Sequence, residues 1–179
     1  MILKNKYTYV IQKKDYDCGV AASYALLVNS KLKDVKYSQL AKTLNLTKNG
    51  VSYRNIASFI SSFSDLKPRV KTRSSLSELK NETKKGRLAI VAYQTWGKKH
   101  EVKNLRCGHY SVVVRVLRNK VYLLDPAAHK DWGDGLGWRV MDTKEFSSLW
   151  VDKEYGKIVK RWMVTVKPLK RRKSLKHIS

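Results

Sequence analysis

Hydrophobic positions in the first half of the chain recur at helical spacing. The segment 18–28 is apolar nearly all round, which is typical of a buried central helix. Segment 37–44 predicts a second, short helix, and apolar residues three and four positions apart predict a third helix over 52–64. Ser75 followed by Glu78 has the pattern of a capping box and predicts that a fourth helix begins there.

In the second half of the chain the hydrophobic pattern changes to that of strands. Five segments are rich in β-branched and aromatic residues, a strand-like lead precedes the first helix, and one short helix is predicted over 143–150. Helices first and strands later is the order of an α+β fold, in which N-terminal helices pack on a mainly antiparallel sheet. The six strand-like segments are 7–11, 88–93, 109–116, 121–124, 138–141 and 162–166.

Length and composition indicate one globular domain. A chain of 179 residues can bury about two-thirds of its unfolded surface in a single core. The hydrophobic fraction of 42% and the aromatic fraction of 10% exclude general disorder. We therefore assign residues 1–168 to the domain and residues 169–179 to a basic, flexible tail.

Cysteine usage and the lengths of apolar runs bear on location. Only Cys18 and Cys107 occur, which excludes a disulfide framework and a multi-cysteine zinc site and favours a reducing compartment. The first residues leave no room for a signal-peptide core. The apolar run 88–93 is far shorter than the ~20 residues that a membrane span needs. The sequence thus predicts a cytoplasmic protein without a transmembrane segment.

The formal net charge of +24 is the feature that least suits a simple enzyme. Such a charge attracts phosphate backbones, anionic membranes and acidic substrates. The basic residues are scattered along the chain and are densest over 167–173, and no nucleic-acid-binding motif accompanies them. Two interpretations remain open, a solvated basic surface with a tail, or a surface that binds an anionic partner.

Cys18 is the candidate nucleophile. A cysteine nucleophile reacts as the thiolate and needs a histidine base with an orienting partner. Cys18 opens the predicted helix 18–28, where the positive end of the helix dipole favours the thiolate, and Gly19 would let a substrate backbone approach. A lone buried cysteine is also a common inert component of a core. Position alone leaves both interpretations open.

His109 and Asp125 are the candidate base and its partner, because they lie at matching ends of two predicted strands. If the hairpin loop is residues 117–119, Asp125 falls opposite Ser111, and His109 is its diagonal neighbour on the same face, ~7–8 Å away at the backbone. A regular two-residue loop would place the two side chains on opposite faces. A catalytic pair therefore requires an odd loop or a bulge. Otherwise His109 caps a strand edge and Asp125 caps a turn before Pro126.

Gln12, six residues before Cys18, could donate its side-chain amide to a developing oxyanion together with the backbone N–H of Cys18. An isolated glutamine is more often an ordinary surface residue. The order glutamine, cysteine, histidine and aspartate along the chain supports the four residues jointly more than it supports any one of them.

At these positions the chain resembles the bacteriocin-leader-processing, double-glycine peptidases, a branch of the papain-like cysteine peptidases. The resemblance covers about residues 5 to 167 and includes the stand-alone relatives of that family. It is carried by Gln12 and by the segments 17–22, 108–114, 121–127, 93–97 and 145–150.

The resemblance implies a papain-like fold and hydrolysis of a peptide or related amide through a thioester. It implies that Cys18 is the nucleophile, His109 the general base and then acid, Asp125 the residue that orients His109, and Gln12 an oxyanion donor. No substrate carries over, because the better-known members are fused to a transporter. The alternative is a non-catalytic module that binds nucleic acid or another anionic partner.

Other polar residues add no cofactor or metal to this prediction. The histidines in two predicted long loops, His100 and His129, have Asp131 and Asp134 as possible companions, but no close-set ligand pair occurs. Cys107 lies two residues before His109 and could form a reversible disulfide with Cys18, or be a bystander. We predict no metal and no cofactor.

Overall fold

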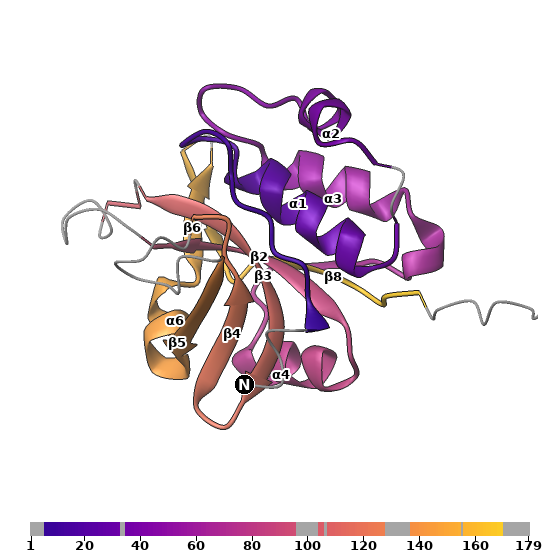
Figure 1. Ribbon diagram of the computed structural model, residues 1–179. Coiled ribbons are helices and arrows are strands. Elements are labelled where there is room, and N and C mark those ends of the chain that lie inside the picture. Colours follow the sequence, from indigo (N-terminus) through magenta and orange to yellow (C-terminus); the bar gives the residue numbers. More distant parts are fainter. Residues whose placement is uncertain are drawn as a thin grey trace, which may run out of the picture.

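The computed structural model describes residues 6–32, 35–95, 104–105, 107–127, 137–154 and 156–169. In these residues a central sheet separates two groups of helices, as Figure 1 shows. One face carries α1 (Cys18–Asn29), α2 (Tyr37–Thr43) and α3 (Tyr53–Ser61). The other face carries α4 (Leu76–Lys84) and α6 (Thr143–Leu149).

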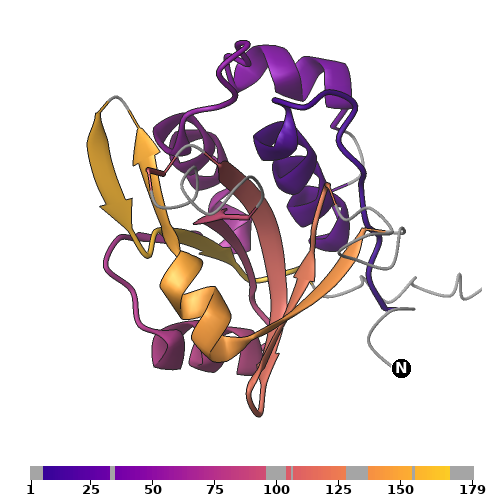
Figure 2. The same cartoon turned by 90° about the vertical axis from the view of Figure 1, so that its left-hand side faces the viewer.

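The central sheet has six strands, and every neighbouring pair is antiparallel. The predicted α+β class is therefore confirmed. In spatial order the strands are β1 (Arg69–Lys71), β8 (Met163–Val166), β2 (Leu88–Gln94), β3 (Gly108–Leu117), β4 (Lys120–Leu124) and β5 (Trp138–Asp142). A separate hairpin of β6 (Val151–Glu154) and β7 (Lys157–Lys160) stands beside the sheet, in orange to yellow in Figure 2.

Strand β2 shows why the second half of the chain has long apolar runs. Its residues alternate between the two cores: Leu88 and Ile90 pack with the group that includes α1, whereas Ala89 and Val91 pack with the group that includes α4. Because helices cover both faces, every residue of β2 is buried. A strand buried on both faces reads as a continuous apolar run rather than an alternating one.

The predicted helices are confirmed with small shifts at their ends. The capping box of α4 is present, with Ser75 and Glu78 bonded to each other's backbone N–H groups. Helix α3 ends at Ser61, before a short 3₁₀ turn, η2 (Ser64–Leu66). The strand-like lead was wrong, because residues 8–11 are not in a strand. This segment is tied to α1 instead, where the Asn29 side chain accepts from the Thr8 N–H and donates to its carbonyl.

The hairpin between β3 and β4 differs from the predicted one. Leu117 pairs with Lys120, so the loop has two residues rather than three, and Arg118 has a positive φ of 54°. The extra residue is placed further along, where a β-bulge shifts the register between Val113 and Arg115. The bulge restores the register that the longer loop was expected to provide.

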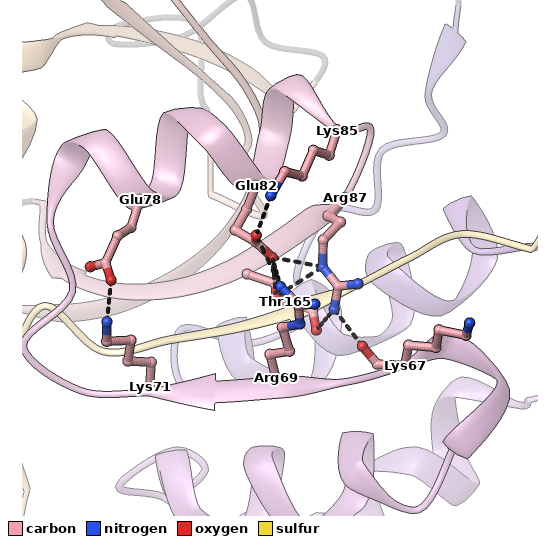
Figure 3. A network of polar contacts seen from close by, with 8 residues as sticks. All are labelled: Lys67, Arg69, Lys71, Glu78, Glu82, Lys85, Arg87 and Thr165. Carbon is pink, nitrogen blue, oxygen red and sulfur yellow. Dashed lines mark hydrogen bonds and ion pairs between the residues drawn. The ribbon is translucent and has the colours of Figure 1, made fainter.

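A buried ion pair fastens α4 to the edge of the sheet (Figure 3). The Arg87 guanidinium lies 2.9 Å from the Glu82 carboxylate and also donates to the hydroxyl and carbonyl of Thr165 on β8. Arg69 on β1 contacts the same carboxylate at 3.2 Å. Burying charges is costly unless they are paired and hydrogen-bonded, and here each charge has several partners.

No helix among the described residues is long and apolar enough to cross a membrane. Of the predicted basic tail, only Leu169 belongs to the described part, and its N–H donates to the carbonyl of Ser30.

Candidate active site

Cys18 is the first residue of α1, and only 7% of its surface is exposed. Asp17 before it accepts hydrogen bonds from the N–H groups of Lys13 and Lys14 and from the Tyr37 hydroxyl, which folds the chain tightly ahead of the helix. The thiol thus stands at the N-terminal, positive end of a helix of 12 residues.

Gly19 lets α1 pack closely against its neighbours in the core. A Cβ at Gly19 would lie 3.1 Å from the Val51 side chain and 3.2 Å from the Tyr110 ring. Both distances are tighter than ordinary carbon contacts.

His109 and Asp125 meet in the interior. His109 Nε2 lies 2.6 Å from Asp125 Oδ1, and neither side chain is exposed. Because Val112 pairs with Leu124, continuing the register past the bulge places Asp125 opposite Ser111, as predicted. The Ala127 N–H donates to the same carboxylate oxygen at 3.0 Å, which fixes the carboxylate toward the imidazole.

Cys18 completes a row with His109 and Asp125, because its thiol lies close enough to the imidazole to raise the pKa of that ring. Nε2 of the imidazole contacts Asp125, so Nδ1 is the ring nitrogen that can exchange a proton with the sulfur. Burial by itself lowers the pKa of His109, but the charges of Asp125 and Cys18 and the hydrogen bonds to both raise it to about 9. The arrangement favours the protonated form of the imidazole.

The pKa of Asp125 moves in the opposite direction. Burial by itself raises it, but the imidazolium charge and the hydrogen bonds from His109, Ala127 and Tyr93 lower the pKa of this carboxyl to about 2. Asp125 is therefore a carboxylate at every pH at which a peptidase would work, and it can hold the imidazole in one orientation.

The far oxygen of Asp125 has partners that the sequence did not reveal. The Tyr93 hydroxyl donates to Asp125 Oδ2 at 2.8 Å and lies 3.2 Å from the Ser111 hydroxyl. Arg139 on β5 approaches the same oxygen at 3.5 Å. Tyr93 pairs with His109 across β2 and β3, so its place beside the site depends on strand register. The only sequence signal was its membership in the segment 93–97 that carries the family resemblance.

The backbone of Gln12 is hydrogen-bonded to the chain just after Asp125. Its backbone N–H donates to the carbonyl of Pro126, the residue after Asp125, at 3.0 Å. Its side-chain amide donates to the carbonyl of Lys14 at 2.9 Å, while its Oε1 is buried without a partner among the described residues. The contact with Pro126 brings the segment before α1 to the end of β4.

A cavity of about 620 Å³ includes the Cys18 thiol in its lining. Its walls come from the start of α1, the segment 47–52 before α3, the beginning of β3 and strand β6. His109 and Asp125 are buried and are not part of this lining, so Cys18 is the member of the row that the cavity reaches.

Of the remaining sequence candidates, only Cys107 belongs to the described residues. Cys107 is buried, its N–H donates to the Gln94 side chain, and neither cysteine is in a disulfide. His100, His129, Asp131 and Asp134 lie outside the described residues.

Comparison with known proteins identifies the architecture. The model of a family described as the peptidase C39 family matches residues 6–154. No curated protein matches the chain. Three similar solved structures, at 16–19% sequence identity, have TM-scores of 0.61 to 0.66, and at such identity the likeness shows the fold alone.

The first of these structures is a double-glycine-motif protease from an AMS/PCAT transporter, in complex with the leader peptide. It has 18% identity and a TM-score of 0.61, over 91% of this chain and 92% of that one. The peptidase domain of Streptococcus ComA, a bifunctional ABC transporter of a quorum-sensing pathway, has 19% identity and a TM-score of 0.61, over 91% and 99%. A C39-like peptidase from Bacillus anthracis has 16% identity and a TM-score of 0.66, over 96% and 98%.

Proposed function

We propose that this chain, which belongs to the peptidase C39 family and is a cysteine peptidase of papain-like fold, uses Cys18, His109, Asp125 and Gln12 to hydrolyse a peptide. The observation that carries the assignment of residues is the row in which the His109 imidazole is hydrogen-bonded to the Asp125 carboxylate and lies close to the Cys18 thiol. Three distant parts of the sequence supply its members, and a cavity gives access to the sulfur.

In the proposed reaction the thiolate of Cys18 attacks the carbonyl carbon and forms a C–S bond, while the carbonyl π electrons move to the oxygen. His109 then donates its proton to the leaving nitrogen as the C–N bond breaks, which leaves a thioester and a free amine. Water attacks the thioester, and His109 takes a proton from it. Cleavage of the C–S bond releases the acid and restores the thiolate and the imidazolium.

The tetrahedral intermediates require donors for the oxyanion. The backbone N–H of Cys18 is one of the first N–H groups of α1, which have no acceptor within their own helix. Gln12 is proposed as the second donor, which requires its amide to turn from Lys14 toward the cavity.

A peptide is proposed as the substrate because the family consists of peptidases and one structural relative was solved with a leader peptide. Two unlinked cysteines support the proposal that the protein works in a reducing, cytoplasmic environment. No feature of the fold or of the comparisons favours the alternative of a non-catalytic, anion-binding module.

The test is to incubate the wild-type protein and Cys18→Ala with a peptide library of defined sequence and to identify new termini by mass spectrometry. We expect cleavage by the wild type that Cys18→Ala abolishes. Cleavage that persists in Cys18→Ala would contradict the assignment of the nucleophile.

A further inference from the structure

Two carboxylates from strand β6, Asp152 and Glu154, line the same cavity as the Cys18 thiol. They are two residues apart on one strand, so their side chains point to the same side. Neither forms an ion pair with any of the described residues, in a chain whose formal net charge is +24. Carboxylates that pair with no described cation are unexpected in so basic a chain.

Asp152 is held firmly in the wall of the cavity. Its Oδ1 accepts from the Lys153 N–H at 2.8 Å and from the side chain of the fully buried Gln94 at 3.1 Å. Gln94 also donates to the carbonyl of Val151. A Cβ at Gly108 would stand only 2.4 Å from Asp152 Oδ1. The carboxylate thus lies against β3 at the residue that precedes His109, a place open to it only because that residue is glycine.

The charge of Asp152 is incompletely compensated at this position. Burial raises the pKa of its carboxyl to about 6, and the neighbouring charge of Glu154 adds to the rise, whereas hydrogen bonds from Lys153 and Gln94 and the charge of His109 oppose it. The pKa of Tyr110, which also lines the cavity, is raised by burial and then by the charges of Asp152, Glu154 and Cys18. A cation entering the cavity would relieve this cost.

The other charged groups of the lining do not cancel the negative charge of Asp152 and Glu154. Asp15 adds a third carboxylate, and Lys48 and Lys153 supply two amines, neither of them paired with Asp152 or Glu154. Within the described residues, the N–H of Tyr53 is the polar partner of the Glu154 carboxylate, at 2.9 Å. Acidic residues by themselves do not make a binding site. Here they line the cavity in which a cysteine peptidase must receive its peptide.

We propose that Asp152, assisted by Glu154, makes this cavity select a peptide with a positively charged group near the scissile bond, either a Lys or Arg side chain or a free α-amino group. The inference rests on the proposed function, because a cation in this cavity selects substrates only if Cys18 is the nucleophile. Asp152 and Glu154 are specificity residues and take no part in bond breaking.

Charge-matched thiol reagents test the cavity without a known substrate. Cationic 2-(trimethylammonium)ethyl and anionic 2-sulfonatoethyl methanethiosulfonates each form a disulfide with the thiolate and release methanesulfinate. The rate of modification at Cys18 is measured by mass spectrometry, and the ratio of the cationic to the anionic rate is compared among variants. We expect Asp152→Asn and Glu154→Gln each to lower this ratio about fivefold or more.

Asp65→Asn is the matched control, because it makes the same change in net charge at an exposed residue outside the cavity lining. A ratio that falls equally in Asp65→Asn, or stays unchanged in both cavity variants, would overturn the inference and leave the proposed function standing. A Cys18 that reacts with neither reagent would overturn the proposed function, and the inference with it.

Pairs of peptides distinguish whether the selected positive charge is on a side chain or at the N-terminus. Sequences that differ only by lysine against norleucine test the side chain, and free against acetylated N-termini test the α-amino group. We expect the wild type to prefer the charged member of one pair and Asp152→Asn to lose that preference. Equal cleavage of both members in both pairs by the wild type would contradict the inference.

Discussion

His109 Nε2 stands 2.6 Å from Asp125 Oδ1, in a hydrogen bond that solvent does not reach. The two side chains meet because β3 has one extra residue between Val113 and Arg115. Regular pairing from the two-residue loop would place them on opposite faces of the sheet. The bulge is therefore the backbone feature on which the proposed catalytic row depends.

Tyr93→Phe should slow catalysis without weakening substrate binding. The hydroxyl that it removes donates to Asp125 Oδ2 at 2.8 Å, and hydrogen bonds to charged groups contribute about 1.5–3 kcal/mol. We expect kcat to fall about tenfold or more and KM to change little, because Tyr93 is not in the cavity lining. Steady-state kinetics on a peptide cleaved by the wild type measures both.

Tyr122→Phe is the control for Tyr93→Phe, because it removes the same hydroxyl from a tyrosine that packs against Trp138 instead. An equal loss of kcat in the two variants would contradict a positioning role for Tyr93.

Gln12→Ala should slow peptide cleavage while leaving the alkylation of Cys18 almost unchanged. Loss of one oxyanion donor typically lowers kcat on the order of 100-fold or more. Alkylation of Cys18 by iodoacetamide forms no oxyanion, so its rate should stay near that of the wild type. Parallel losses in peptide cleavage and in alkylation would show that Gln12 acts on the thiol or on the fold rather than on the oxyanion.

Stability should depend on pH in a direction set by His109 and Asp125. The pKa of His109 is raised from 6.5 to about 9. The stabilisation that protonated His109 gives to the folded state is therefore complete below pH 6.5 and is lost as the pH rises through 9. The pKa of Asp125 is lowered from 3.8 to about 2, so its contribution is present above 3.8 and is lost as pH falls toward 2.

The difference in free energy of unfolding between the wild type and Asp125→Asn should therefore be largest between about pH 4 and 6.5 and should shrink above 9. Urea denaturation of both proteins at several pH values measures it. A difference that stays constant from pH 5 to 10 would contradict the ionised pair.

Gly108→Ala should destabilise the protein, because the added methyl group would collide with the Asp152 side chain. The new Cβ would stand 2.4 Å from the Asp152 carboxylate, and such overpacking typically costs about 1–3 kcal/mol. The same substitution in an Asp152→Ala background should cost clearly less, as urea denaturation of the four proteins would show. An equal cost in both backgrounds would place the strain elsewhere.

The fold was predictable where burial leaves a strong pattern. Helix α1 was predicted because its residues are apolar on every side, and β2 because both of its faces are covered. Strand β1, with three exposed residues, is too short to show a period. The strands β6 and β7 were missed because charged side chains make up much of each, so that neither displays an apolar alternation.

The site was predictable only in part, for a related reason. Cys18, His109 and Asp125 each have a side chain whose chemistry suggests a role, and the requirement for a bulge or odd loop followed from their spacing. Tyr93 lies at the site because β2 pairs with β3. Asp152 lines the cavity because it is on β6, a strand that the sequence did not reveal. Their roles depend on tertiary register, which local patterns do not encode.

The most direct test of the catalytic row is the rate at which iodoacetamide modifies Cys18 near neutral pH, followed by mass spectrometry in the wild type and in His109→Ala. Cys107 in the same chain is the internal reference, because it is as buried as Cys18 but lies outside the cavity lining. We predict fast modification of Cys18 in the wild type and a rate about tenfold or more lower in His109→Ala. Equally slow modification of Cys18 in both proteins would contradict a thiolate activated by His109.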